Sequence, residues 1–282
     1  MLFRRGMLLS NVNPSILFVN PSLGTKRYTE EDKLRSYLSL GTLAAALGNR
    51  SFLKRFAVRS DKDEIILTSD SDYHEFDISV LNLSLKPDHL SNRKYFSDLL
   101  RQLNRTPLMV CMTATSAHLD EAREIALTAR QLVPDALRII GGPHVTVAAA
   151  EFLSTSEFQA ACIGEGVETL SEIALHVALA GVLDLSTIEG ITYKHDNGKV
   201  YSSPLRMPLL DLDEYPFPSD SLELFRGLTV DPAKSQNQLI YILSGYGCPH
   251  ECIFSAQRSM HGRKIRERSA ENIIDEIGCL VA

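Results

Sequence analysis

Several features that would assign this sequence to a class at once are missing from it. No apolar run among its 282 residues reaches the roughly 18 residues that cross a bilayer, so we expect no membrane span. The net charge of −6 gives no support for nucleic-acid binding. The five cysteines are an odd number and the apolar part of residues 1–10 is too short for a signal peptide, which indicates reduced thiols and a cytoplasmic location. The glycine-rich signatures of nucleotide-binding loops are absent, which counts against a nucleotide as the ligand.

What the sequence does contain is a repeated alternation of strand and helix patterns. Hydrophobic residues make up 44% of the chain and charged residues 23%, which is enough to build a globular core. Five apolar runs predict strands, at residues 16–19, 76–83, 108–112, 137–140 and 160–163. Helical patterns occur at residues 38–47, 95–103, 119–132 and 168–179. Strands that are apolar throughout are buried on both faces, so we predict an α/β fold with a flavodoxin-like or Rossmann-like parallel sheet and helices on each side.

The loops that follow the predicted strands favour a ligand groove. Parallel strands end at one edge of a sheet, and ligands bind in the crevice beyond that edge. Four loops there are rich in glycine, proline, serine or threonine, although turn formation alone would explain any single one of them. The candidate cofactor contacts are Asn20, Pro21, Thr113, Thr115, Ser116, Gly141, Gly142, Pro143, His144, Gly164, Glu165 and Gly166.

The last third of the chain has a different composition. Residues 188–194 and 199–202 flank a turn of sequence HDNG and predict a hairpin. Four prolines between residues 204 and 218 predict an extended linker rather than a core element. A strand is predicted at 239–243, and a helix with a serine cap at 269–281. We expect a tail (1–13), an α/β domain (14–203), a linker (204–236) and the start of a second domain (237–282).

Two of the cysteines stand in a pattern that indicates metal binding. Cys248 and Cys252 lie in a glycine-containing loop after the predicted strand, and thiolates suit zinc and the irons of iron–sulfur clusters. Nearby histidines could complete a zinc site, but their spacing fits no common zinc finger. Cys111 and Cys162 lie inside apolar runs and are expected to be buried hydrophobic residues.

The residues around this loop resemble a known family. The stretch 245–269, which begins GYGCPHECIFS, strongly resembles the opening of a radical S-adenosylmethionine domain, the start of a partial (β/α) barrel. The resemblance implies that Cys248 and Cys252 bind irons of a 4Fe–4S cluster, that S-adenosylmethionine chelates another iron, and that Phe254 lies near the adenine. The family's third cysteine is replaced by Ser255, and a serine oxygen binds iron less well than a thiolate. Three interpretations stay open: an engineered change, a naturally decayed copy, or a serine that ligates iron.

Motifs in the preceding part of the chain resemble the cobalamin-binding domain of cobalamin-dependent radical S-adenosylmethionine enzymes. They are VNP at 19–21, LGTLAAAL at 40–47, GGPH at 141–144, GEGVET at 164–169 and LDEYPFP at 212–218. The resemblance adds Leu40, Gly41 and Thr169 to the candidate contacts and implies cobalamin between the two domains, across the carboxyl ends of the sheet. It also implies that no protein histidine is needed on the cobalt. Residues 72–77 contain a histidine but lack the glycine of the D-x-H-x-x-G motif that supplies one elsewhere.

The resemblance also implies an activity. Intact relatives use cobalamin, the cluster and S-adenosylmethionine for methyl transfer or for ring or skeletal rearrangement, with methylcobalamin as the methyl carrier. The sequence ends one strand and one helix into the second domain, so we expect a fragment that is inactive alone and self-associates through its exposed last helix. The alternatives are a non-catalytic or degenerate corrinoid-binding module, a flavodoxin-like domain for another ligand, and a small zinc or iron protein.

Overall fold

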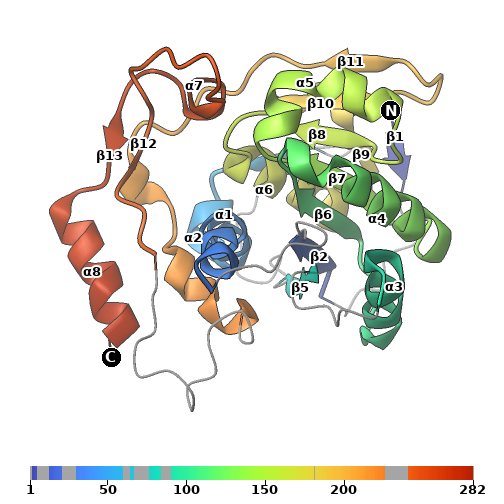
Figure 1. The fold of residues 1–282 in the computed structure, drawn as a ribbon, viewed down its shortest axis with the longest axis horizontal. Coiled ribbons are helices and arrows are strands. Elements are labelled where there is room, and N and C mark those ends of the chain that lie inside the picture. Colours follow the sequence, from blue (N-terminus) through green and yellow to red (C-terminus); the bar gives the residue numbers. More distant parts are fainter. Residues whose placement is uncertain are drawn as a thin grey trace.

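Five parallel strands form the centre of the fold (Figure 1). The computed structural model describes residues 2–4, 13–20, 30–59, 64–66, 76–83, 90–180, 182–225 and 241–281. The strands of the main sheet are β2 (Ser15–Asn20), β5 (Asp77–Asn82), β6 (Met109–Thr113), β7 (Leu137–Gly141), β8 (Ala160–Cys162), β10 (Ile191–Lys194) and β11 (Val200–Ser202). Their order is β11–β10–β8–β7–β6–β2–β5. The strands β5, β2, β6, β7 and β8 run parallel, which confirms the predicted sheet, and the predicted β10–β11 hairpin adds an antiparallel edge.

The strand order creates a switch point beside β2. The first βα unit places β5 on one side of β2, and the chain then returns to build β6, β7 and β8 on the other side. Loops that leave neighbouring strands in opposite directions open a crevice at the carboxyl edge of the sheet. A buried hydrogen bond of 2.9 Å from Asn20 Nδ2 to Asn82 Oδ1 ties the ends of β2 and β5 together at this edge.

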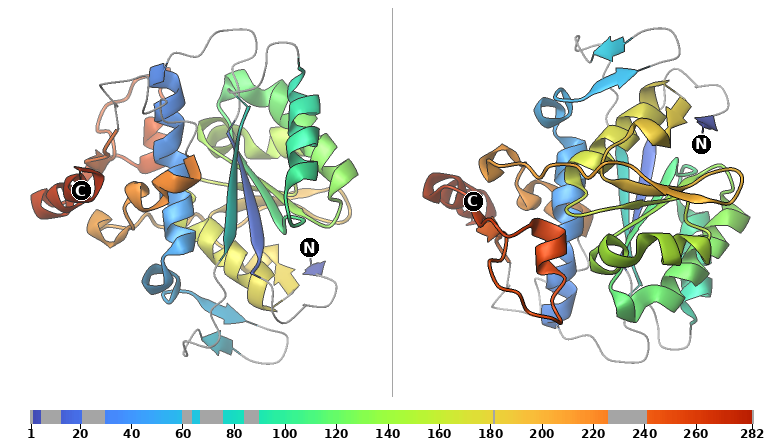
Figure 2. Two further views of the ribbon diagram at one scale, coloured as in Figure 1. Left: turned by 90° about the horizontal axis from the view of Figure 1, so that it is seen from below. Right: turned by 90° about the horizontal axis from the view of Figure 1, so that it is seen from above.

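Helices cover both faces of the sheet (Figure 2). The helices α1 (Glu30–Gly48) and α6 (Val167–Leu175) pack on one face, and α3 (Asn92–Gln102), α4 (Leu119–Leu132) and α5 (Pro143–Ser154) pack on the other. Successive residues of β2 show why both faces are apolar, because Phe18 joins the core under α1 while Val19 joins the core under α3 and α4. Among the helices that the structure describes, none is long and apolar enough to cross a membrane.

Some elements differ from the sequence-based expectation. The loop predicted at 141–144 is partly helical, since Pro143 occupies the first turn of α5, where its missing N–H costs nothing. The α6 helix continues as a π-helical turn, His176–Ala180. The prediction of an N-terminal tail is wrong for residues 2–4. These residues form β1 (Leu2–Arg4), which pairs antiparallel with β9 (Val182–Asp184). A second small hairpin joins β3 (Ala57–Arg59) to β4 (Glu64–Ile66), after the short helix α2 (Arg50–Leu53).

The proline-rich segment is irregular, as predicted. The prediction that it contributes nothing to the core is wrong. It forms short 3₁₀ turns at Leu212–Glu214 and Pro218–Phe225. Leu212 and Tyr215 are 2% and 8% exposed and belong to the core under α1 and α6. Ser221 Oγ donates a hydrogen bond of 3.0 Å to the carbonyl of Gly41, which holds the segment against α1. Prolines prevent regular pairing without preventing the side chains between them from packing.

The segment that follows carries the cysteine loop. It consists of β12 (Gly245–Tyr246), α7 (Gln257–His261), β13 (Arg266–Glu267) and α8 (Ala270–Val281), and lies beside α1 in Figure 1. The predicted helix is confirmed, with the Ser269 hydroxyl accepting from the Asn272 amide at 3.1 Å. The predicted strand at 239–243 is wrong for residues 241–243, and residues 239–240 lie outside the described residues. A strand needs a paired neighbour. In the described part of the chain β13 pairs with Gly245 and Tyr246, and residues 241–243 have no strand beside them.

Replacing Leu212 by alanine tests the packing of the proline-rich segment. We expect Leu212→Ala to lower the free energy of unfolding by about 2 to 4 kcal/mol, because it leaves a cavity in the core. Leu205→Ala, at a side chain that is 74% exposed, should change it by less than about 0.5 kcal/mol. Urea denaturation of both variants measures the difference. Equal stabilities would show that the segment does not contribute to the core.

Candidate functional site

A cavity of about 500 Å³ lies at the carboxyl edge of the sheet. Its walls come from the ends of β2, β6, β7 and β8, from α1, and from the C-terminal segment. Of the candidate residues, those on its wall are Asn20, Leu40, Thr113, Thr115, Gly141, Gly142, Pro143, Gly164, Glu165 and Gly166. The structure therefore brings the four predicted loops together around one space.

The remaining candidates do not line the cavity. Ser116 Oγ and His144 Nδ1 lie 3.0 Å apart in an exposed contact with each other. Thr169 is buried beneath the wall, where its hydroxyl donates to the carbonyl of Glu189 at 3.1 Å. Gly41 faces the proline-rich segment through its carbonyl, and Phe254 is 89% exposed on the cysteine loop. Pro21 and the histidine motif at 72–75 lie outside the described residues.

Gly142 allows the loops after β6 and β7 to approach each other closely. Its φ of 102° lies in the region that favours glycine. A Cβ at this position would lie 2.8 Å from the carbonyl oxygen of Ala114 and 2.8 Å from the hydroxyl oxygen of Thr113. Any side chain here would separate the two loops that form this wall.

His118 lines the cavity and was not among the predicted residues. Its Nδ1 accepts a hydrogen bond of 3.2 Å from the backbone N–H of Thr115, so the neutral ring carries its proton on Nε2. Nε2 is buried and has no hydrogen-bond partner among the described residues. Burial lowers the pKa of His118, which favours the neutral ring. The Thr-x-x-His spacing of this capping box was the signal in the sequence that could have identified it.

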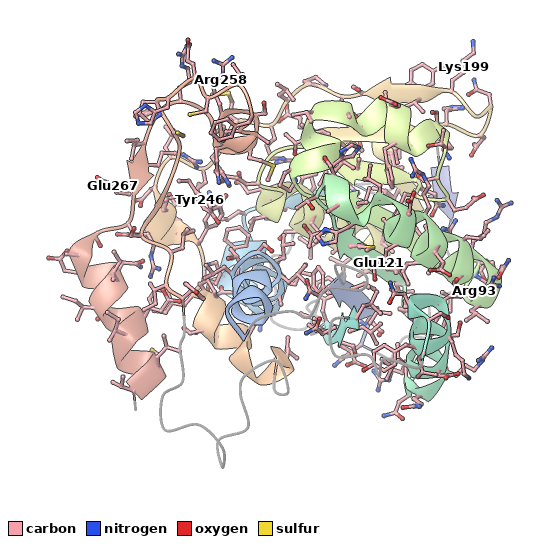
Figure 3. All side chains as sticks on the ribbon, viewed as in Figure 1. Arg93, Glu121, Lys199, Tyr246, Arg258 and Glu267 are labelled. Atoms are coloured by element: carbon pink, nitrogen blue, oxygen red, sulfur yellow. The ribbon has the colours of Figure 1, made fainter. Side chains whose placement is uncertain are left out.

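The C-terminal segment closes one side of the cavity, with Leu243, Tyr246, Met260 and His261 on the wall. Tyr246, labelled in Figure 3, stacks on the His261 ring with centroids 4.4 Å apart and planes 15° apart. Thr42 of α1 lines the same cavity. The Thr146 hydroxyl donates to Met260 Sδ at 3.0 Å, which joins α7 to α5. Sequence reasoning missed these residues because they act across the two parts of the chain.

Glu165 connects the same two parts. Its carboxylate accepts hydrogen bonds from Arg266 and from Tyr215 Oη at 3.4 Å, and lies 3.1 Å from His261 Nδ1. Burial by itself would raise the pKa of Glu165, but the hydrogen bonds from His261 and Arg266 and their charge outweigh it and hold the pKa below its usual value. Glu165 is therefore ionised at neutral pH.

Two thiols lie on the floor of the cavity. Cys111 and Cys162 line it from β6 and β8, and both are buried, as predicted. Burial raises the pKa of Cys162 to about 12 and that of Cys111 well above its usual value. Both side chains are neutral thiols at physiological pH.

The cysteine loop lies outside the cavity wall. Cys252 is exposed and Cys248 is half-buried. The Ser255 amide donates to the Cys252 carbonyl at 3.2 Å, and its hydroxyl accepts from the Gln257 amide at 3.3 Å. No group of three or more histidine, cysteine, aspartate or glutamate side chains in the described part of the chain is arranged to hold a metal ion. With two cysteines and a serine hydroxyl engaged at the start of α7, these residues do not supply the three cysteine ligands that the resemblance implies for a 4Fe–4S cluster.

Comparison with known families identifies the domain around the cavity. A profile of the B12 binding domain matches residues 66–174, which include β5 to α6 and most of the cavity wall. Residues 66–174 therefore belong to a B12-binding domain. The cobalamin-binding domain predicted from the sequence motifs is thereby confirmed for these residues.

Several curated relatives are similar to this chain in sequence. An uncharacterised methyltransferase of Pyrococcus horikoshii is 30% identical over 196 residues, which are 68% of this chain and 41% of the relative. An anaerobic magnesium-protoporphyrin IX monomethyl ester cyclase of Rubrivivax gelatinosus is 27% identical over 62% of this chain and 31% of its own. The hopanoid C-3 methylase of Methylococcus capsulatus is 26% identical over 64% of this chain and 34% of its own. The chain thus spans less than half the length of each of these relatives.

Solved structures share the fold of the B12-binding domain and of the segment after it. The methyltransferase TsrM of Kitasatospora setae, solved with cobalamin and a [4Fe-4S] cluster, superposes with a TM-score of 0.62 at 17% identity, over 95% of this chain and 47% of TsrM. The enzyme OxsB, solved with aqua-cobalamin and S-adenosylmethionine, gives 0.64 at 17% identity, over 95% of this chain and 31% of OxsB. At this identity the likeness shows the fold alone.

Ser255→Cys tests whether the third position is what the loop lacks for a cluster. We expect anaerobic reconstitution with iron and sulfide to give about four irons per chain in the variant and well below that in the wild type, because thiolate is the better iron ligand. Iron analysis and the absorption spectrum measure the difference. Ser259→Cys, in the following helix, is the control for an added thiol, and equal iron in all three proteins would contradict the prediction.

Proposed function

We propose that this chain binds cobalamin in the cavity at the carboxyl edge of the sheet, as the cobalamin-binding portion of a radical S-adenosylmethionine enzyme. The observation that carries the proposal is the position of the cavity, which lies beside the switch point of a B12-binding domain and is closed by the segment that bears the cysteine loop. Open α/β sheets bind their ligands at this position.

The cavity wall suits a large ligand with an apolar ring and polar substituents. Leucines of α1 and Leu170 of α6 offer apolar contacts to one part of it. Asn20, Thr113 and Thr115 offer polar groups near the strand ends. The His118 Nε2–H is a buried donor without a partner among the described residues, and a buried donor of this kind gains by meeting a ligand acceptor. Cobalamin, when bound, supplies a carrier for a methyl group.

The same relatives support a reaction for the whole protein. A methyltransferase, a methylase and a cyclase are among the similar proteins, which supports methyl transfer or ring formation by the enzyme to which this portion corresponds. The second candidate is a corrinoid-binding module without radical chemistry. The observation that favours it is Ser255, which stands where the family has its third cluster thiolate.

Gly141→Leu tests the position of the cofactor. A Cβ at Gly141 meets only Cys162 Cβ, at 3.9 Å, so the chain should fold while the rest of the leucine occupies the cavity. We expect the variant to bind hydroxocobalamin about tenfold more weakly or worse, as measured by anaerobic absorption titration. Gly48→Leu, where a Cβ has open space, should bind as the wild type does. Equal binding by both variants would exclude this cavity.

His118→Leu tests the role of the buried imidazole. A nitrogen that carries a proton cannot ligate cobalt, so we infer that His118 donates a hydrogen bond to the bound ligand instead. The variant should bind cobalamin about two- to tenfold more weakly, the range that one hydrogen bond supplies. His144→Leu, off the cavity wall, should bind normally. An electron paramagnetic resonance spectrum of bound cob(II)alamin with a nitrogen splitting that disappears in His118→Leu would contradict the inference.

A further inference from the structure

The B12-binding domain and the C-terminal segment meet around one buried carboxylate. Glu165 lies in the loop after β8, and the groups that bond to it come from distant parts of the chain. We propose that Glu165 is a positioning residue that docks the C-terminal segment on the cavity and thereby fixes the cysteine loop relative to it. The proposal concerns the docking itself, and only its ligand measurement rests on the proposed binding of cobalamin.

The side chains that bond to Glu165 are largely buried. Its side chain is 7% exposed, and the side chain of Arg266, with which it forms an ion pair, is 3% exposed. His261 Nδ1 lies 3.1 Å from the same carboxylate, with 15% of its side chain exposed. Tyr215 donates from the proline-rich segment at 3.4 Å. A single, largely buried carboxylate therefore meets groups from both sides of the interface.

Arg266 carries the effect of Glu165 into the C-terminal segment. Its guanidinium also donates to the carbonyl of Leu209, at 2.5 Å, and to that of His261, at 3.4 Å. It lies over the Tyr246 ring, with Cζ 5.6 Å from the centroid. Among the described ion pairs, Glu165 is the only carboxylate bonded to Arg266. Removing one partner of a buried ion pair leaves the other charge uncompensated, so the arginine depends on Glu165 to stay in this position.

The position of Arg266 in turn determines that of the cysteine loop. Arg266 pairs with Tyr246 in the β12–β13 ladder, and Cys248 follows two residues later. The Cys248 amide donates to the carbonyl of Gly262 at 3.2 Å, which fixes the start of the loop to the same hairpin. At Gly247, with φ of 105°, a Cβ would lie 2.2 Å from the carbonyl oxygen of Lys264. The hairpin is therefore a tightly packed unit, and its docking sets the place of the loop.

Glu172→Gln supplies a matched control for Glu165→Gln. Glu172 forms an ion pair with Arg206, and both side chains are about one-fifth exposed. Arg206 also donates to Thr169, so this pair links the proline-rich segment to α6, and no hydrogen bond or ion pair among the described residues joins it to the C-terminal segment. Each glutamine variant removes one charge and retains the shape of the side chain.

Hydrogen exchange of the full chain is the first measurement. In Glu165→Gln we expect the amides of Tyr246 and Arg266 to exchange at least about tenfold faster, a change of about 1.4 kcal/mol in opening free energy, while the amides of β6 and β7 are unchanged. Glu172→Gln should leave the β12–β13 amides as they are. Unchanged exchange at β12–β13 in Glu165→Gln would overturn the proposal. Faster exchange across β6 and β7 as well would also overturn it, because Glu165 would then support the whole fold.

A double mutant tests whether Glu165 acts through Arg266. If it does, Glu165→Gln combined with Arg266→Gln should expose β12–β13 no more than the worse single variant. Additive effects would mean that the two residues act independently and would contradict the proposed route.

The rate of cobalamin release gives a measurement that a purely structural role would not change. We expect Glu165→Gln to release bound hydroxocobalamin at least about tenfold faster than Glu172→Gln, because the side of the cavity closed by Tyr246 and His261 opens more often. Equal release rates would overturn the link between docking and the cavity. Absence of cobalamin binding in the wild type would instead refute the proposed function, while the exchange measurement would still report on the docking.

Discussion

Burial of the parallel strands on both faces is the constraint from which the rest of the structure follows. Helices occupy each face, so the carboxyl ends of the strands are where the sheet can meet a ligand. The switch point beside β2 places the crevice in the middle of that edge, not at its end. The C-terminal segment lies at this edge, where it lines the cavity together with α1 and contacts α5. In this position it can cover a ligand and hold its cysteine loop nearby.

Much of the fold could be predicted from the sequence because its signals are local. The apolar runs and helical periods located the five parallel strands and most of the helices, and the HDNG turn located the hairpin. The proline-rich segment could not be predicted in the same way. Proline excludes regular pairing but says nothing about whether an intervening side chain such as Tyr215 finds a place in the core, which depends on the distant residue Phe52, whose ring centroid lies 5.9 Å away.

The candidate site also has one part that could be predicted from local sequence signals and one part that could not. The loops that follow the strands could be predicted, because every parallel strand ends at the same edge. The other wall could not, because Glu165 and Arg266 are 101 positions apart and no periodic pattern links them. His118 lies between these cases. Its capping partner is three residues away, but which ring nitrogen accepts that hydrogen bond is decided by the path of the backbone at Thr115.

The two cysteines on the floor of the cavity have a consequence for any metal-bearing ligand that enters it. Sulfur attacks or binds a metal as thiolate, and burial keeps Cys111 and Cys162 protonated. A ligand held above β6 and β8 therefore meets a soft, polarisable surface that packs like a hydrocarbon and offers it neither an axial ligand nor a reducing electron pair. The same strands would present a competing coordination site if those thiols were exposed to water. Their chemical inertness is thus a property of the sheet in which they lie.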